Sequence, residues 1–75
     1  MPYKVSNLLK LNSEHQHQMD KFGIQNHPPD RWAVILMEEV GEVAKAIQDG
    51  LGYEEELIQV AAVAMSALEN YQNGN

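Results

Sequence analysis

The chain has 75 residues, no cysteine and a formal net charge of −6. This predicts one small domain without disulfides or a thiolate zinc site, and argues against a protein that binds the nucleic-acid backbone. The sequence contains no apolar run near the roughly 20 residues that span a bilayer, and no apolar secretory segment at its N-terminus. We therefore expect a cytoplasmic protein with neither a membrane nor a nucleic-acid polymer as its partner.

The N-terminal part predicts a helix from about Ser6 to Phe22. Apolar and polar side chains recur there at helical spacing, at Leu8, Leu11, His15, Gln18 and Phe22. Gly23 is a natural stop for this helix. Ser13 and Gln16 also fit a capping box, so a later start is the alternative.

The next segment, Ile24–Pro29, predicts a connection followed by a second helix. Its two consecutive prolines cannot continue a helix, and they favour an extended backbone in the residues that lead into the second helix. Asp30 suits the N-cap of the second helix, and Pro29 in the first turn is the alternative start. Gly50 and Gly52 are expected to end this helix.

A third helix is predicted from Glu54 to about Tyr71. Three consecutive glutamates suit the positive end of its dipole, and its many alanines favour helix over strand. This helix is apolar almost all round, which a monomer of three helices cannot bury. We therefore predict a single all-α domain over residues 1–75, a short bundle of about three helices completed by homo-oligomerisation as a homodimer or dimer of dimers.

The second helix carries three glutamates within an otherwise apolar stretch: Glu38, Glu39 and Glu42. Glu39 projects only about 60° from the apolar stripe of this helix, and Glu42 lies a further 60° or so around it. A carboxylate on an apolar face is costly unless it is paired, protonated or bound to metal, and neighbouring like charges raise that cost. A bound cation would resolve the conflict. A solvated acidic surface beside Lys45 is the alternative for all three glutamates. It suits Glu38, which projects toward Lys45, better than Glu39.

A further carboxylate, Glu56, opens the third helix and is followed by Gln59. A short glycine-containing turn would place the second and third helices antiparallel, which brings Glu42 and Glu56 toward each other. Ligands that are all oxygen suit a hard divalent cation, Mg²⁺ first and Mn²⁺ second. Compensation of the helix dipole is the alternative role for Glu56.

These residues resemble the MazG-like family of all-α nucleoside triphosphate pyrophosphohydrolases. Glu38-Glu39-Val-Gly-Glu42 matches the family's E-E-x-x-E, and Glu56-x-x-Gln59 matches its E-x-x-D with one change. The segments 15–21 and 27–32 are similar to the lead-in of small members. The resemblance covers roughly Glu14 to Glu69.

The resemblance implies hydrolysis between the α- and β-phosphates of a nucleotide, giving a monophosphate and pyrophosphate, in a role that removes unwanted nucleotides. By position, Glu39, Glu42, Glu56 and Gln59 would hold Mg²⁺, and Glu38 would orient or deprotonate the attacking water. Gln59 keeps a carbonyl oxygen but removes the negative charge of the family's aspartate. We expect this change to weaken metal binding and to alter or abolish activity.

Four further residues are candidates for substrate binding. Gln18 and Lys21 lie one turn apart and could contact phosphate oxygens, while His27 could contact the nucleotide and Trp32 could stack on a base. Ordinary structural roles are the alternatives, with Trp32 in the core. Because few cations are available to hold a triphosphate, the site is expected to borrow residues from a neighbouring subunit.

The alternative function is a non-catalytic, oligomeric helical module that binds a metal or nucleotide. Gln59 is the residue that favours it. A di-iron carboxylate protein is disfavoured, because neither Glu39 nor Glu56 has the expected histidine three residues later.

Overall fold

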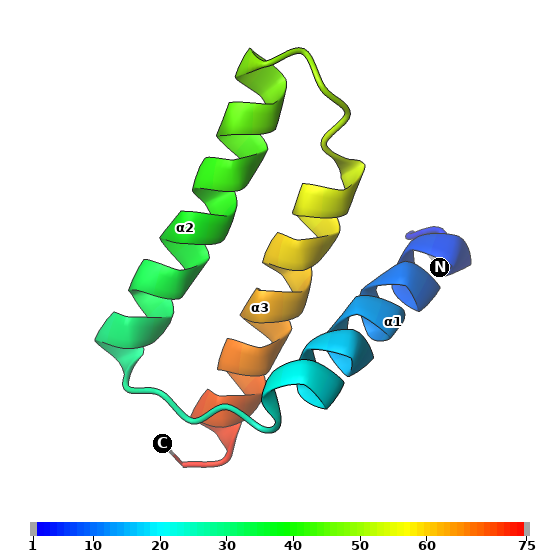
Figure 1. The fold of residues 1–75 in the computed structure, drawn as a ribbon. Coiled ribbons are helices and arrows are strands. Elements are labelled where there is room, and N and C mark those ends of the chain that lie inside the picture. Colours follow the sequence, from blue (N-terminus) through cyan, green and yellow to red (C-terminus); the bar gives the residue numbers. More distant parts are fainter. Residues whose placement is uncertain (1, 75) are drawn as a thin grey trace.

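The computed structural model describes residues 2–74, and its described residues form three helices and no strand, which confirms the predicted all-α class. The elements are α1 (Val5–Phe22), α2 (Pro29–Gln48) and α3 (Glu54–Gln72). Figure 1 shows α2 and α3 as antiparallel neighbours, with α1 crossing beside α3. The single domain predicted over 1–75 extends to Met1 and Asn75, which lie outside the described residues.

The helix ends follow the local chemistry of proline and glycine. α1 begins one residue before the predicted start and runs through Ser13, so the later start at a capping box is wrong. Pro28 is the N-cap of α2 and Pro29 occupies its first turn, so Asp30 is not the cap. Proline is favoured there because its fixed φ suits the first turn and its missing N–H is not needed. After α2, Gly50 takes a φ of 70°, a conformation that costs glycine little.

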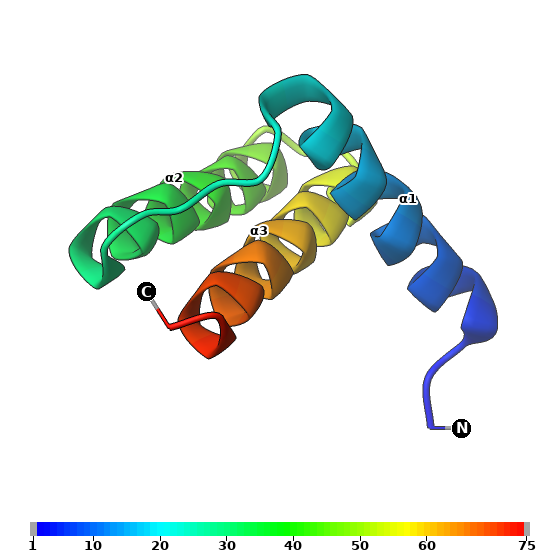
Figure 2. The same ribbon diagram turned by 90° about the horizontal axis from the view of Figure 1, so that it is seen from below.

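The central helix of the arrangement is α3, which packs against both α1 and α2. Among the described residues, the buried apolar side chains belong to Trp32 and Ala46 on α2 and to Ala62 and Val63 on α3. Figure 2 shows α1 on one side of the α2–α3 hairpin, while no described helix covers the other side. A core this small contributes little stability for a domain of this length.

One buried polar residue, Asn70, joins the far end of α3 to the connection and to α2. Its Oδ1 accepts hydrogen bonds from the His27 backbone N–H at 2.8 Å and from the Trp32 indole Nε1–H at 2.7 Å. Its amide group also donates to Asn26 Oδ1 at 3.2 Å. These three hydrogen bonds fix the path of the connection, and therefore the position of α2 relative to α3.

At the opposite end of the molecule, α1 and α3 are joined by an exposed ion pair. Lys10 Nζ lies 3.2 Å from Glu54 Oε2. An exposed pair of this kind contributes at most about 1 kcal/mol, so apolar packing sets the crossing of α1 over α3. None of the helices in the described part combines the length and apolar character that a membrane span requires.

Candidate functional site

A groove runs between α1 and α2, and α3 forms its floor. We call it the acidic groove, after the carboxylates beside it. Its lining comes from all three helices and from the connection after α1: Gln18, Phe22, Gln25, Trp32, Ile35, Glu39, Val63 and Ser66. The first helix and the antiparallel hairpin therefore build this cavity together, and the aromatic and aliphatic members give it an apolar wall beside a carboxylate.

Glu39 is the residue of the groove whose pKa departs clearly from its usual value. It is half-buried, and its pKa lies above the usual value of 4.5, first because burial disfavours the charged form. Like charges raise the pKa further, in order from Glu42, Glu38 and Glu14. The structure thus confirms that Glu39 is a carboxylate on an apolar face, surrounded by others of the same sign.

The neighbouring helix α1 contributes Glu14 and Gln18 to this environment. The Gln18 amide donates a hydrogen bond to Glu14 Oε2 at 3.0 Å, and Gln18 also lines the groove. Gln18, a candidate contact for phosphate oxygens, therefore lies in the same groove as Glu39. Its partner Glu14 was not recognised from the sequence, although its place one turn before Gln18 on the same helical face is a signal for it.

On α3, Glu56 and Gln59 are both half-buried, whereas Glu54 and Glu55 in the same first turn are exposed. One carboxylate oxygen of Glu56, Oε2, is buried and accepts no hydrogen bond from any residue between Pro2 and Gly74. A buried oxygen without a donor is energetically unfavourable. A bound cation would satisfy this oxygen.

The donor set fits a hard divalent cation, because the candidate ligands are three carboxylates and one amide oxygen. Glu39 lies in the groove, Glu42 is exposed one turn further along α2, and Glu56 and Gln59 lie one turn apart on α3. Within residues 2–74, however, no three histidine, cysteine, aspartate or glutamate side chains lie close enough to hold one ion. The chemistry of the donors therefore fits Mg²⁺, while the side chains do not already form a coordination sphere.

Two other candidate residues, Lys21 and Glu38, are exposed. The Lys21 ammonium lies 5.2 Å from the centre of the adjacent Phe22 ring, at the α1 edge of the groove. Glu38 is close enough to Glu39 to raise its pKa. Lys45, the expected partner of Glu38, instead lies 3.8 Å from Asp49.

The candidates His27 and Trp32 have structural partners. The two rings meet edge to face with their centres 4.9 Å apart, and His27 Nε2 lies 3.1 Å from Gln25 Oε1. The Trp32 side chain is buried in the core, as its alternative role predicted, although it also forms part of the groove wall. Both residues hold the connection in place beside the groove.

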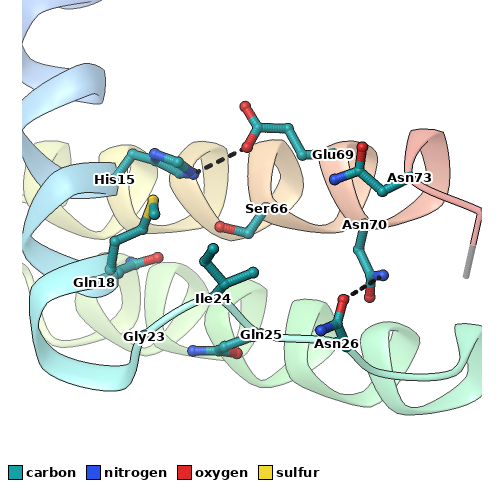
Figure 3. Close-up of a pocket in the computed structure, with 11 residues that line it drawn as sticks. His15, Gln18, Gly23, Ile24, Gln25, Asn26, Ser66, Glu69, Asn70 and Asn73 are labelled. Atoms are coloured by element: carbon teal, nitrogen blue, oxygen red, sulfur yellow. Dashed lines mark hydrogen bonds and ion pairs between the residues drawn. The ribbon is translucent and has the colours of Figure 1, made fainter.

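A second pocket continues from the acidic groove toward the C-terminal end of α3 (Figure 3). The two cavities share Gln18, Gln25 and Ser66. In Figure 3, His15 of α1 and Glu69 of α3 face each other, with His15 Nε2 3.8 Å from Glu69 Oε1. Its lining includes five amide side chains and the hydroxyl of Ser66, beside the apolar side chains of Met19 and Ile24. Amide groups can hydrogen-bond a neutral polar ligand.

A scan against protein-family models finds no match to this chain, and neither curated proteins nor solved structures match it significantly. The functional interpretation therefore depends on the residues of the groove and on the motif resemblance.

Proposed function

We propose that the protein is a Mg²⁺-dependent nucleoside triphosphate pyrophosphohydrolase of the MazG-like type. The observation that carries this proposal is Glu39, a half-buried carboxylate whose charge is opposed by burial and by three neighbouring carboxylates. A divalent cation is the simplest ligand that turns this unfavourable arrangement into a favourable one. The buried Oε2 of Glu56 supports the same conclusion from the opposite helix.

Glu39, Glu42, Glu56 and Gln59 would hold the ion through oxygen atoms. When bound, Mg²⁺ would offset the charge of the triphosphate and stabilise the negative charge on the phosphoryl and leaving oxygens. Without it, a groove bordered by carboxylates repels a nucleotide. Magnesium should therefore be needed for substrate binding as well as for chemistry.

In the proposed reaction, Glu38 orients a water molecule and accepts its proton as the water oxygen bonds to the α-phosphorus. The bond from the α-phosphorus to the α–β bridging oxygen breaks, and pyrophosphate leaves with that oxygen. Gln18 and Lys21, at the α1 side of the groove, would contact phosphate oxygens. The second pocket (Figure 3) would hold the base or sugar, with its amide side chains as hydrogen-bond partners.

The working form of this enzyme would be a cytoplasmic homo-oligomer, a dimer or dimer of dimers. Its role would be to remove unwanted nucleotides from the cellular pool. The Lys21 ammonium lies over the ring of Phe22, which lines the groove. One lysine holds a triphosphate weakly, which favours a contribution from magnesium.

The site assignment is tested by measuring Mg²⁺-dependent binding of a non-hydrolysable nucleoside triphosphate analogue by calorimetry. We expect Glu42→Gln to abolish this binding with the helical content unchanged, because Glu42 is exposed and its replacement disturbs no packing. Glu55→Gln is the matched control: it removes one exposed carboxylate from the turn that holds Glu56, and should bind like wild type. Unchanged binding by Glu42→Gln would contradict the assignment.

A non-catalytic binding module is the second candidate function. Gln59 favours it, since one ligand position lacks a negative charge. This candidate predicts Mg²⁺-dependent nucleotide binding without release of pyrophosphate.

A further inference from the structure

The residue that follows α3, Asn73, differs from the other asparagines of the chain in its neighbour. The sequence contains six asparagines, and Asn73-Gly74 is its one Asn-Gly pair. Asn73 is the C-cap of α3, and both residues of the pair are exposed. Gly74 has a φ of 85°, a left-handed conformation that costs glycine little. The pair therefore lies in water, just beyond the last helical residue, Gln72.

An asparagine side chain is open to attack by the backbone nitrogen of the residue after it. The Gly74 nitrogen would form a bond to Cγ of Asn73, and the bond from Cγ to the amide nitrogen would break, so that ammonia leaves with the Gly74 amide proton. A water molecule then opens the cyclic imide at either of its carbonyl carbons, which gives aspartate or isoaspartate. Solvent water is the co-reactant, and nothing is oxidised or reduced. Glycine favours the ring closure because it has no Cβ to crowd the ring.

The backbone after α3 holds the attacking nitrogen weakly. The Gly74 N–H donates to the Tyr71 backbone oxygen at 3.2 Å, which is the upper end of the usual range. This bond lies in the turn after the helix, where helix ends fray. Asn70 is the contrast within the same helix: it is buried, its amide is held by hydrogen bonds, and a bulky tyrosine follows it. Of these two asparagines, Asn73 is the one whose surroundings allow the reaction.

Conversion would add a carboxylate where α3 already carries negative charge. Glu69 lies one turn before Asn73, and both side chains line the second pocket (Figure 3). Carboxylates four residues apart on a helix repel each other, and a negative charge at a helix C-terminus opposes the helix dipole. Within the described part of the chain, the last turn of α3 contains no basic residue that would offset these effects.

We infer that Asn73 is a site of spontaneous deamidation, whose product places a second carboxylate beside Glu69 at the second pocket and loosens the end of α3. The change is one-way, because the ammonia is lost to solvent. It therefore makes the second pocket more acidic as the protein ages. The reaction needs neither magnesium nor nucleotide, so the inference does not depend on the proposed function.

The site is tested by peptide mapping with mass spectrometry, on wild type incubated at constant temperature in a mildly alkaline buffer. We expect aspartate and isoaspartate to accumulate at Asn73 while Asn12, which is exposed and precedes a serine, stays unchanged over the same period. The matched control is Gly74→Ala, which keeps Asn73 but crowds the ring closure and should stop the conversion. Its strain is confined to the turn beyond α3, because a Cβ on Gly74 would contact no side chain in the described part of the chain.

Conversion at Asn73 that is no faster than at Asn12, or equally fast in Gly74→Ala, overturns the inference. The effect of the charge is measured separately by urea unfolding of Asn73→Asp against the neutral variant Asn73→Gln. At neutral pH Asn73→Asp should have an unfolding equilibrium constant about twofold to fivefold higher, and the difference should vanish below about pH 3, where the carboxyl is protonated. Equal stability of the two variants at neutral pH would show that the new charge does not loosen α3 and would overturn that part of the inference.

Discussion

Replacement of Asn70 by alanine should destabilise the whole fold, because this side chain is 4 % exposed and joins three segments. Its Oδ1 is 2.7 Å from the indole nitrogen of Trp32 and 2.8 Å from the backbone nitrogen of His27. Asn70→Ala removes the acceptor of both donors and the amide that donates to Asn26. A buried donor that loses its hydrogen-bond acceptor lowers the free energy of unfolding by about 1–3 kcal/mol.

We expect a total loss of about 2–4 kcal/mol, since the indole is buried while the backbone of the connection is closer to water. A chain of this length has a free energy of unfolding of about 4–11 kcal/mol, so the variant should lose a large part of it. For a domain of this size the melting temperature should fall by at least about 8 °C.

The assay is thermal and urea unfolding, followed by circular dichroism and by the fluorescence of Trp32, which is the sole tryptophan. All samples need the same protein concentration, because association shifts the apparent stability. Asn73→Ala, an exposed position one turn along, is the control and should lie within about 0.5 kcal/mol of wild type. If Asn70→Ala is as stable as this control, the reasoning about the Asn70 hydrogen bonds is wrong.

Two further predictions concern the acidic groove. The pKa of Glu39 is higher in the folded protein than its usual value of 4.5. Between these two pKa values the folded protein holds a proton that the unfolded chain has released. The contribution of Glu39 to the free energy of unfolding therefore falls as the pH rises from 4.5 through the folded pKa. Glu39→Gln should therefore be more stable than wild type at about pH 7 without magnesium, and this difference should vanish below pH 4.5. Urea unfolding at both pH values measures the difference in stability. A variant that is less stable than wild type at neutral pH would contradict this prediction. Gln59→Asp should tighten Mg²⁺ binding in calorimetry by adding a carboxylate to the donor set. An unchanged affinity would mean that Gln59 does not face the ion.

The helices were predictable because local chemistry sets their ends. Pro28 and Pro29 force the start of α2, and the extended approach before them needs no knowledge of the rest of the chain. The choice between Asp30 and Pro29 was harder, since both residues are favoured at helix starts for different reasons. The position of Glu39 on an apolar face was also predictable, because it follows from helical periodicity alone.

The sequence could not reveal the contacts that depend on how the helices cross. Glu14 lies on a different helix from Glu39, and only the packing of α1 beside the hairpin brings its charge near. Asn70 resembles an ordinary polar residue near a C-terminus, and its burial depends on the return of the connection to the end of α3. The burial of Trp32 in the core depends on the same return of the connection, because the Trp32 indole donates its hydrogen bond to Asn70.

The central claim is tested most directly by pyrophosphate release from a panel of ribo- and deoxyribonucleoside triphosphates, each with and without Mg²⁺. The proposed function predicts Mg²⁺-dependent release with the monophosphate as co-product, and with oxygen from labelled water in the monophosphate alone. No release from any nucleotide, by folded protein that binds the analogue with Mg²⁺, would contradict the enzyme and favour the binding module.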